Sequence, residues 1–213
     1  MSNVVDHKVM AMDVAKRERV INAAMEEFCK GYKYANTDVV VNKAGISKGL
    51  LYHYFKTKKE LLSYVYQYAS ELIVQNFLKG IDFSETDFLK RLWQMITVKV
   101  QLSYQYPMVF EFIGAVYFSQ EAEMVQVMEQ FKTLAGQWWQ TNSRVFEGLD
   151  LSLFKEGIDV EKAINVIRFS LTSYTEQQLK TNPKNHGFQP RFEELMEDLG
   201  GYMDLFRTAF YKQ

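Results

Sequence analysis

The segment Asn36–Glu60, NTDVVVNKAGISKGLLYHYFKTKKE, predicts two short helices joined by a tight turn and followed by the start of a third helix. Asn36 suits a helix start, because a short side-chain oxygen accepts a hydrogen bond from an unpaired N–H group of the first turn. Gly45 suits the end of that helix, because glycine adopts a positive φ without strain. Ser47 can cap the second helix, and Thr57 with a glutamate three residues later forms a capping box for the third.

A helix, a short glycine-containing turn and a second helix are the parts of a helix-turn-helix DNA-binding motif. Leu51 and Phe55 are four residues apart and should face inward, which leaves the other side of the second helix exposed. Lysines can pair with phosphates, a glycine permits close backbone approach, and Tyr and His side chains can reach phosphate oxygens or base edges. The third helix adds free N–H groups that favour an anion. The candidate DNA-binding residues are Thr37, Ser47, Lys48, Gly49, Leu50, Tyr52, His53 and Lys58, of which Leu50, Tyr52 and His53 are the candidates for sequence preference.

The TetR family of transcriptional regulators has a signature that this chain resembles at Gly45–Leu61, GISKGLLYHYFKTKKEL. The family's DNA-reading helix ends in a similar Leu-Tyr-x-aromatic-Phe run, followed by a polar residue and a lysine before Glu-Leu-Leu. The resemblance continues upstream at Ala23–Phe28 and covers about residues 16–64. One departure is Val41, where a small residue is usual, so we expect a slightly wider crossing of the two short helices. The resemblance implies an all-α fold, with an N-terminal three-helix helix-turn-helix domain and a larger C-terminal helical domain for ligand binding and dimerisation.

The composition also predicts an all-helical chain, because there are only three prolines in 213 residues and the apolar residues recur in long helical periods. A single cysteine, Cys29, excludes an internal disulfide framework. Together with the lack of a signal peptide and of a membrane-spanning apolar run, it favours a cytoplasmic protein. Lys and Arg outnumber Asp and Glu by 11 to 7 in residues 1–60, whereas acidic residues lead by 19 to 14 in residues 61–213. A basic N-terminal part fits a segment that meets phosphates.

The domain boundary is expected at residue 60, with an arm and helix-turn-helix domain over residues 1–60 and a helical ligand-binding and dimerisation domain over residues 61–213. The helix from Leu61 to near Gly80 joins the two, and the resemblance implies that it transmits ligand binding to the DNA-binding head. Residues 108–118, MVFEFIGAVYF, are almost wholly apolar but too short to cross a membrane, so a wholly buried helix is expected there.

Aromatic residues are concentrated in the predicted helices of the C-terminal part. Core packing accounts for most of them, but as a set they also suit a cavity for an apolar or planar ligand. Glu111 or Glu176 facing such a cavity would favour a cation, whereas Arg168 would favour a carboxylate, and the sequence leaves both open. The candidate ligand-binding residues are Trp93, Tyr104, Phe110, Glu111, Tyr117, Trp138, Arg168 and Tyr174.

The last two predicted helices carry wide apolar faces, which are typical of a four-helix interface between two subunits. A dimer also suits a short DNA-reading helix, because two copies about 34–36 Å apart read successive major grooves. The alternative is that these faces pack into the core of their own subunit. The candidate dimer residues are Ile164, Ile167, Leu171, Leu199, Tyr202, Met203 and Phe206.

Enzyme motifs are missing from the sequence: it has no glycine-rich phosphate loop, no Cys or His cluster at metal spacing and no Gly-x-Ser-x-Gly. We therefore expect no enzyme, no cofactor and no metal. Adjacent acidic pairs such as Glu26 and Glu27 are interpreted as solvated helix faces.

The residues and the resemblance together predict a homodimeric, ligand-responsive transcriptional regulator of the repressor type. Its expected partners are a two-fold symmetric double-stranded DNA operator and a small apolar or aromatic ligand that releases the protein from it, with no membrane. The rival interpretations are a helical protein–protein adaptor without DNA binding and an all-helical enzyme that uses the aromatic cavity.

Overall fold

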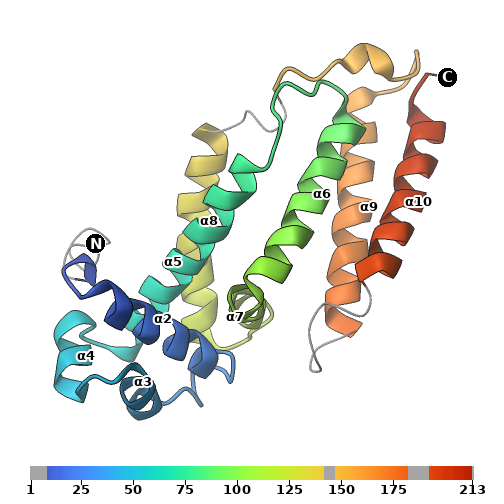
Figure 1. Ribbon diagram of the computed structural model, residues 1–213. Helices are drawn as coiled ribbons and strands as arrows, with labels where there is room; N and C mark the ends of the chain where they lie inside the picture. The colour runs from blue at the N-terminus through green and yellow to red at the C-terminus, as the bar shows by residue number, and fades with distance from the viewer. Residues whose placement is uncertain (1–8, 142–146, 182–191, 213) are drawn as a thin grey trace. The chain divides into compact units, whose positions relative to one another are not determined.

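The computed structural model describes residues 9–141, 147–181 and 192–212, and these residues form an all-α fold, as predicted (Figure 1). Inside the helices, the side chains of residues 132–141, 172, 175, 176, 178–181, 192 and 193 lie outside the description. The helices are α2 (Val14–Phe28), α3 (Thr37–Ala44), α4 (Lys48–Tyr54), α5 (Lys58–Lys79), α6 (Phe88–Gln105), α7 (Pro107–Tyr117), α8 (Ala122–Thr141), the short 3-10 helix η2 (Leu151–Leu153), α9 (Val160–Thr181) and α10 (Phe192–Phe210).

The chain forms two compact units, each built from two separate stretches. Unit 1 covers Met1–Lys79 and Gln105–Asn142 and contains α2 to α5, α7 and α8. Unit 2 covers Gly80–Tyr104 and Ser143–Gln213 and contains α6, η2, α9 and α10. The boundary expected at residue 60 concerns a division of function, and it stays a prediction.

The core of unit 1 joins the N-terminal helices to α7 and α8. Helix α2 packs against α3, α5 and α7, and α8 packs against α5 and α7. Phe28, Leu62, Phe112 and Met124, from four different helices, are all fully buried in this one cluster. Burying four large apolar side chains of this kind stabilises the unit by about 1.5–3 kcal/mol each. The N-terminal helices therefore share a hydrophobic core with α7 and α8.

The core of unit 2 lies among α6, α9 and α10, which run side by side in Figure 1. Leu89, Ile167 and Leu199 bring one side chain from each helix into this cluster. An isolated antiparallel bridge between Phe154 and Tyr211 fixes the end of the chain beside the segment that follows η2.

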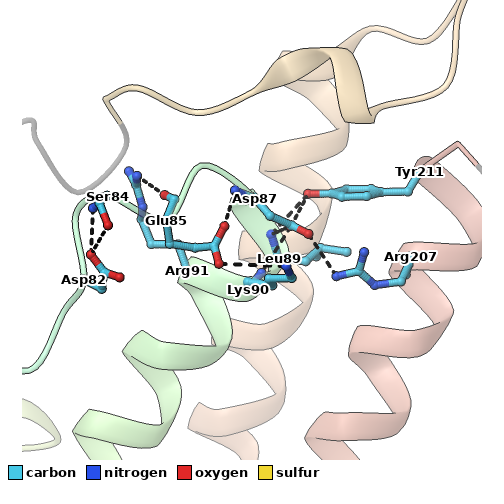
Figure 2. Close-up of polar contacts among 9 residues, drawn as sticks. All are labelled: Asp82, Ser84, Glu85, Asp87, Leu89, Lys90, Arg91, Arg207 and Tyr211. Atoms are coloured by element: carbon cyan, nitrogen blue, oxygen red, sulfur yellow. Dashed lines mark hydrogen bonds and ion pairs between the residues drawn. The ribbon is translucent and has the colours of Figure 1, made fainter.

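A buried carboxylate ties the start of α6 to the end of α10 (Figure 2). Asp87 accepts hydrogen bonds from the Leu89 N–H at 2.9 Å and the Tyr211 hydroxyl at 3.0 Å, and it forms an ion pair with Arg207 at 3.2 Å. Burial opposes ionisation of Asp87, but the hydrogen bonds from the Lys90 N–H, Tyr211 and Arg207 outweigh it and hold the pKa of this carboxyl below its ordinary value. Burial in turn raises the pKa of the Tyr211 hydroxyl. The network caps α6 and fastens α10 to it.

Arg91 is the largest fully buried side chain of the described residues. Its guanidinium donates to the backbone carbonyls of Glu147 at 2.7 Å and Phe83 at 3.0 Å, and also to that of Glu85. A guanidinium suits this position because it carries five N–H donors in a planar arrangement. Arg91 thereby joins two loops of unit 2 that are far apart in the sequence.

Residues 108–118 were predicted to form a wholly buried helix. The helix forms, but the prediction that it is wholly buried is wrong. Val109, Phe112 and Val116 are buried, whereas Glu111, Tyr117 and the following Phe118 are exposed. The buried residues lie three or four positions apart, so only one face of α7 enters the core of unit 1. An apolar composition all round the helix therefore predicted more burial than the packing provides.

Candidate nucleic-acid interface

Helices α3 and α4 begin and end where their local sequence signals predict. The Asn36 side chain accepts from the Asp38 N–H at 2.8 Å and caps α3, and Gly45 ends that helix with a φ of 65°. The Ser47 hydroxyl accepts from the Leu50 N–H at 3.1 Å and caps α4. Since each cap satisfies a backbone group that the helix leaves unpaired, the two helices are held in a fixed geometry.

Two charged side chains of α2 form hydrogen bonds with the backbone at the two ends of α3. The Arg19 Nε donates to the Ala44 carbonyl at the end of α3, at 3.0 Å. The Glu27 carboxylate accepts from the Asn36 N–H at the start of α3, at 3.1 Å, and from the Lys30 ammonium. Arg19 and Glu27 therefore fix both ends of α3 on α2.

The interpretation of Glu27 as part of a solvated acidic face is wrong. Only 1% of this residue is exposed, whereas Glu26 is partly exposed and pairs with Lys43. Burial opposes ionisation of Glu27, but the contacts with Lys30 and Asn36 outweigh it and hold the pKa of the carboxyl below its ordinary value. Sequence reasoning missed the role of Glu27 because its partner Asn36 lies nine residues away, beyond the range of helix periodicity.

One side of α4 is exposed to solvent, and the opposite side is buried in the core of unit 1. Leu51 and Phe55 are buried, as predicted, and fix the helix against unit 1. Of the candidate DNA-binding residues, Thr37, Leu50 and Lys58 are half-buried and the others are exposed: Ser47, Lys48, Gly49, Tyr52 and His53.

Two polar contacts connect α3 and α4 on this open side. The Thr37 Oγ1 and the Tyr52 hydroxyl lie 3.2 Å apart, within hydrogen-bond distance. The Lys48 ammonium pairs with the exposed Asp38 carboxylate at 2.7 Å, and this hydrogen bond raises the pKa of Lys48. The structure thus brings Thr37, Lys48 and Tyr52 together on one surface. Asp38 is a member of this surface that sequence reasoning missed, because nothing in its own segment indicates a partner ten residues away.

Lys58 is the first residue of α5. Its ammonium nitrogen is 4.7 Å from the centre of the Tyr32 ring, a cation–π arrangement. Half of the predicted capping box forms beside it, since the Thr57 hydroxyl accepts from the Glu60 N–H at 3.0 Å. The Glu60 carboxylate accepts from the N–H of Lys56, one residue before Thr57, at 3.0 Å.

The candidate ligand-binding residues are divided between the two units. In unit 1, Phe110 is half-buried, while Glu111 and Tyr117 are exposed. In unit 2, Trp93, Tyr104 and Tyr174 are half-buried and Arg168 is exposed. Trp138 belongs to unit 1, and its side chain lies outside the described residues. Two open hollows occur in unit 2. One of about 350 Å³ is lined in part by Trp93 between α6 and α10, and one of about 560 Å³ is lined in part by Arg168 on α9.

Most of the candidate dimer residues lie in the core of their own subunit, which is the alternative that the sequence left open. Tyr202 is exposed and Ile164 is half-buried. The other five are buried against α6 or one another: Ile167, Leu171, Leu199, Met203 and Phe206. The large apolar side chains that α9 and α10 do expose include Val166, Phe169 and Leu205, which the sequence pattern did not select.

The part of the chain that the structure describes covers residues 9–141, 147–181 and 192–212. Within it, no group of three or more His, Cys, Asp and Glu side chains is placed to hold a metal ion. Every helix in the same part of the chain is too short or too polar to span a bilayer.

Known proteins resemble this chain both in its N-terminal part and over most of its length. Residues 20–65 match the family model described as bacterial regulatory proteins, tetR family. The HTH-type transcriptional regulator SrpR of Pseudomonas putida is 25% identical over 182 residues, which cover 74% of this chain and 83% of that protein. TtgW, an uncharacterized HTH-type transcriptional regulator of the same species, is 31% identical over 83 residues, which cover 38% of this chain and 58% of that protein.

Solved structures share the fold. The crystal structure of a TetR family transcriptional regulator from Chloroflexus aurantiacus J-10-FL has a TM-score of 0.60 at 19% identity, over 97% of this chain and 98% of that one. The capped helix pair and the matches to HTH-type regulators define the class of the protein as a transcriptional regulator with a helix-turn-helix DNA-binding domain. Residues 20–65 belong to the TetR family of bacterial regulatory proteins.

Proposed function

We propose that the protein is a homodimeric repressor that binds a two-fold symmetric DNA operator and is released from it by a small apolar or aromatic ligand. The observation that carries the proposal is the open side of α4, where Ser47, Lys48 and Gly49 are exposed on a helix whose opposite side is buried. A side of this kind can enter a major groove without rearrangement of the core. The protein would act in the cytoplasm, together with the DNA that it controls.

Phosphate contacts are the first part of the proposal. Lys48 and Lys58 supply positive charge, and the first turn of α5 supplies backbone N–H groups at the positive end of the helix dipole. Such contacts fix the position of the protein on a duplex and make its affinity depend on salt. Tyr52 and His53, which are exposed on α4, would then touch base edges.

The dimer is the second part, and its support is an exposed apolar surface on α9 and α10. Val166 and Phe169 on α9 are 49% and 70% exposed, and Tyr202 and Leu205 on α10 are 37% and 58% exposed. The two helices are aligned by the Tyr174 hydroxyl, which donates a hydrogen bond to the Asp198 carboxylate at 2.6 Å. Neighbouring exposed apolar residues mark an interaction site more often than single ones do. A second copy of the chain would cover all four by pairing the same surface with itself.

The ligand is the third part. The hollow of about 560 Å³ is lined by Leu149, Leu151, Val160 and Ile164 together with a few polar side chains, which is the usual composition of a small-molecule site. The hollow of about 350 Å³ is lined mostly by polar and charged side chains. Trp93 and Arg168 are the candidate ligand-binding residues that line them. If ligand and DNA oppose each other, each must lower the affinity of the other by the same factor.

A mobility-shift titration tests the proposal, with a duplex taken from upstream of the protein's own gene and a salt series from about 50 to 200 mM. We expect a retained complex of two chains per duplex whose affinity falls steeply as salt rises. A failure to retain any duplex at the lowest salt would contradict the proposal and favour the protein–protein adaptor. Small aromatic and apolar compounds added to the retained complex then test release.

Lys48→Ala is predicted to weaken binding to all duplexes to a similar extent. The plot of log affinity against log salt should become flatter by about one unit for each subunit bound, because one phosphate contact is lost. Asp38→Asn is the matched opposite change. It frees Lys48 and removes a negative charge from the same surface, so we expect tighter binding, by about 3–10-fold at low salt. Fluorescence anisotropy over the salt series measures both. Equal salt slopes for Lys48→Ala and the unaltered protein would show that Lys48 makes no phosphate contact.

A further inference from the structure

Tyr32 connects the lysine at the start of α5 to the hydrophobic core of unit 1. One side of the connection is the cation–π contact with Lys58, at 4.7 Å. On the other side, the Tyr32 ring stacks on Phe28 with 6.2 Å between ring centres and 2° between ring planes. Phe28 in turn lies 6.4 Å from the ring of Phe112 on α7. The Tyr32 ring is half-buried and is held by the buried rings of Phe28 and Phe112. It can therefore restrict the rotamers of a lysine side chain that packs on it.

The backbone around Tyr32 is held by a second contact from the turn before α8. Glu121 accepts a hydrogen bond from the Lys33 N–H at 2.7 Å. Its other carboxylate oxygen lies against the position that a Cβ of residue 31 would take, and Gly31 has a φ of 100°. Glycine is favoured there because the backbone is in a left-handed conformation, and any larger residue would also displace the Glu121 carboxylate. The Glu121 carboxylate therefore holds the loop through its hydrogen bond to Lys33 and lies beside Gly31, on the other side of Tyr32.

We propose that Tyr32 is a positioning residue for Lys58, and that Glu121 fixes the loop that carries it, so that the turn between α7 and α8 controls one phosphate contact of the DNA-binding head. The inference rests on the proposed DNA-binding function. Burial, together with the nearby Glu123 carboxylate and the Tyr52 hydroxyl, raises the pKa of Tyr32. All of these residues belong to unit 1.

The regulatory consequence follows from the position of Glu121. A movement of the α7–α8 turn by about 1 Å would break the 2.7 Å hydrogen bond and release the Gly31–Lys33 backbone. Lys58 would lose its supporting ring and with it a fixed direction toward the duplex. A ligand that moves this turn could therefore weaken DNA binding without any change inside α3 or α4.

A double-mutant cycle tests the inference, with affinity and salt slope measured on a duplex of about 30 base pairs from the protein's own upstream DNA. Lys58→Met should flatten the slope by about one unit for each subunit bound. Tyr32→Phe keeps the ring and should match the unaltered protein, whereas Tyr32→Leu removes the ring and should weaken binding by about 3–10-fold. In the Lys58→Met background, Tyr32→Leu should cost nothing further. If Tyr32→Leu prevents folding, pentafluorophenylalanine at position 32 replaces it, since this side chain keeps the shape of the ring and removes its negative face.

Glu121 is tested in the same assay by comparing Glu121→Ala with Glu121→Gln, because both remove the charge but only the glutamine keeps an acceptor for the Lys33 N–H. The alanine variant should bind more weakly than the glutamine variant, and the difference should vanish in the Lys58→Met background. Gln120→Ala, in the same turn and exposed, is the control and should have no effect.

The outcomes separate the inference from the function on which it rests. If the unaltered protein retains no duplex at about 50 mM salt, the proposed function fails and the inference fails with it. If the unaltered protein binds and Lys58→Met flattens the slope, but Tyr32→Leu weakens binding equally with and without Lys58, only the inference is overturned. Tyr32 would then act through the general packing of the head.

Discussion

Replacing Phe169 by glutamate is expected to convert the protein from a dimer to a monomer and to abolish tight DNA binding. Among the side chains of α9 that the structure describes, Phe169 is the most exposed large apolar one, at 70%, and it belongs with the exposed Leu205 of α10 to the proposed interface. In a two-fold interface each substitution occurs twice, so two carboxylates would enter the same apolar contact. Bringing like charges together in this way makes the free energy of dimerisation less favourable by several kcal/mol. The dimer dissociation constant should rise at least about 100-fold, since about 1.4 kcal/mol corresponds to a factor of ten.

Light scattering coupled to size-exclusion chromatography measures the mass, and the mobility-shift assay measures DNA binding by the same sample. Leu151→Glu is the matched control, because Leu151 is an exposed apolar residue of unit 2 that lies on neither α9 nor α10. The control should stay a dimer. A dimer for Phe169→Glu with unaltered affinity would place the subunit interface elsewhere.

Replacing Asp87 by alanine is expected to cause the largest loss of stability among single substitutions of an acidic residue in unit 2. The change removes the acceptor of the Leu89 N–H and of the Tyr211 hydroxyl, and it leaves Arg207 without the partner shown in Figure 2. Loss of one member of a buried, hydrogen-bonded charge network costs about 3 kcal/mol or more. For a chain of this size that corresponds to a fall in Tm of about 6–12 °C.

Thermal unfolding followed by circular dichroism measures this effect. Asp82→Ala is the control, because Asp82 is exposed and its carboxylate accepts only from Ser84 in the same turn among the contacts drawn in Figure 2. It should lower the Tm by no more than about 2 °C. Similar losses for the two variants would show that the Asp87 network does not hold α6 and α10 together.

The same network gives stability a defined dependence on pH. The pKa of Asp87 is lower in the folded protein than the value of about 3.9 expected in the unfolded chain. Its contribution is therefore complete above about pH 4 and is lost as the pH falls through the folded-state pKa. The difference in Tm between the unaltered protein and Asp87→Asn should shrink below about pH 4. A constant difference from about pH 7 down to about pH 2 would mean that Asp87 is not ionised in the folded state.

Local signals made much of the fold predictable. Asn36, Gly45 and Ser47 act on backbone groups within a few residues of themselves, so their effect can be read from a short window. The same holds for Asp159, whose carboxylate accepts from the Lys162 N–H at 3.1 Å and caps α9. The exposed outer side of α4 followed from the four-residue spacing of Leu51 and Phe55, and the structure confirms that both are buried.

Contacts between distant segments explain what the sequence did not predict. The Glu27 carboxylate can be buried because it accepts hydrogen bonds from the Asn36 N–H and the Lys30 ammonium, and the Asp87 carboxylate because it accepts one from the Tyr211 hydroxyl. The sequence around a carboxylate does not indicate which distant residue will bind it. The apolar faces of α9 and α10 contain both core and exposed residues. Ile167 is buried while Phe169, two residues later, is 70% exposed, and periodicity alone cannot say which apolar stripe meets the subunit's own core.

Selection of bound sequences from a random duplex library is the most direct test of the claim that two copies of the α3–α4 surface read DNA together. The account predicts enrichment of a two-fold related sequence whose half-sites are centred about one helical turn, roughly 34–36 Å, apart or at a multiple of that spacing. Phe169→Glu should lose this enrichment. Enrichment of a single asymmetric site, or of no sequence at low salt, would contradict the account.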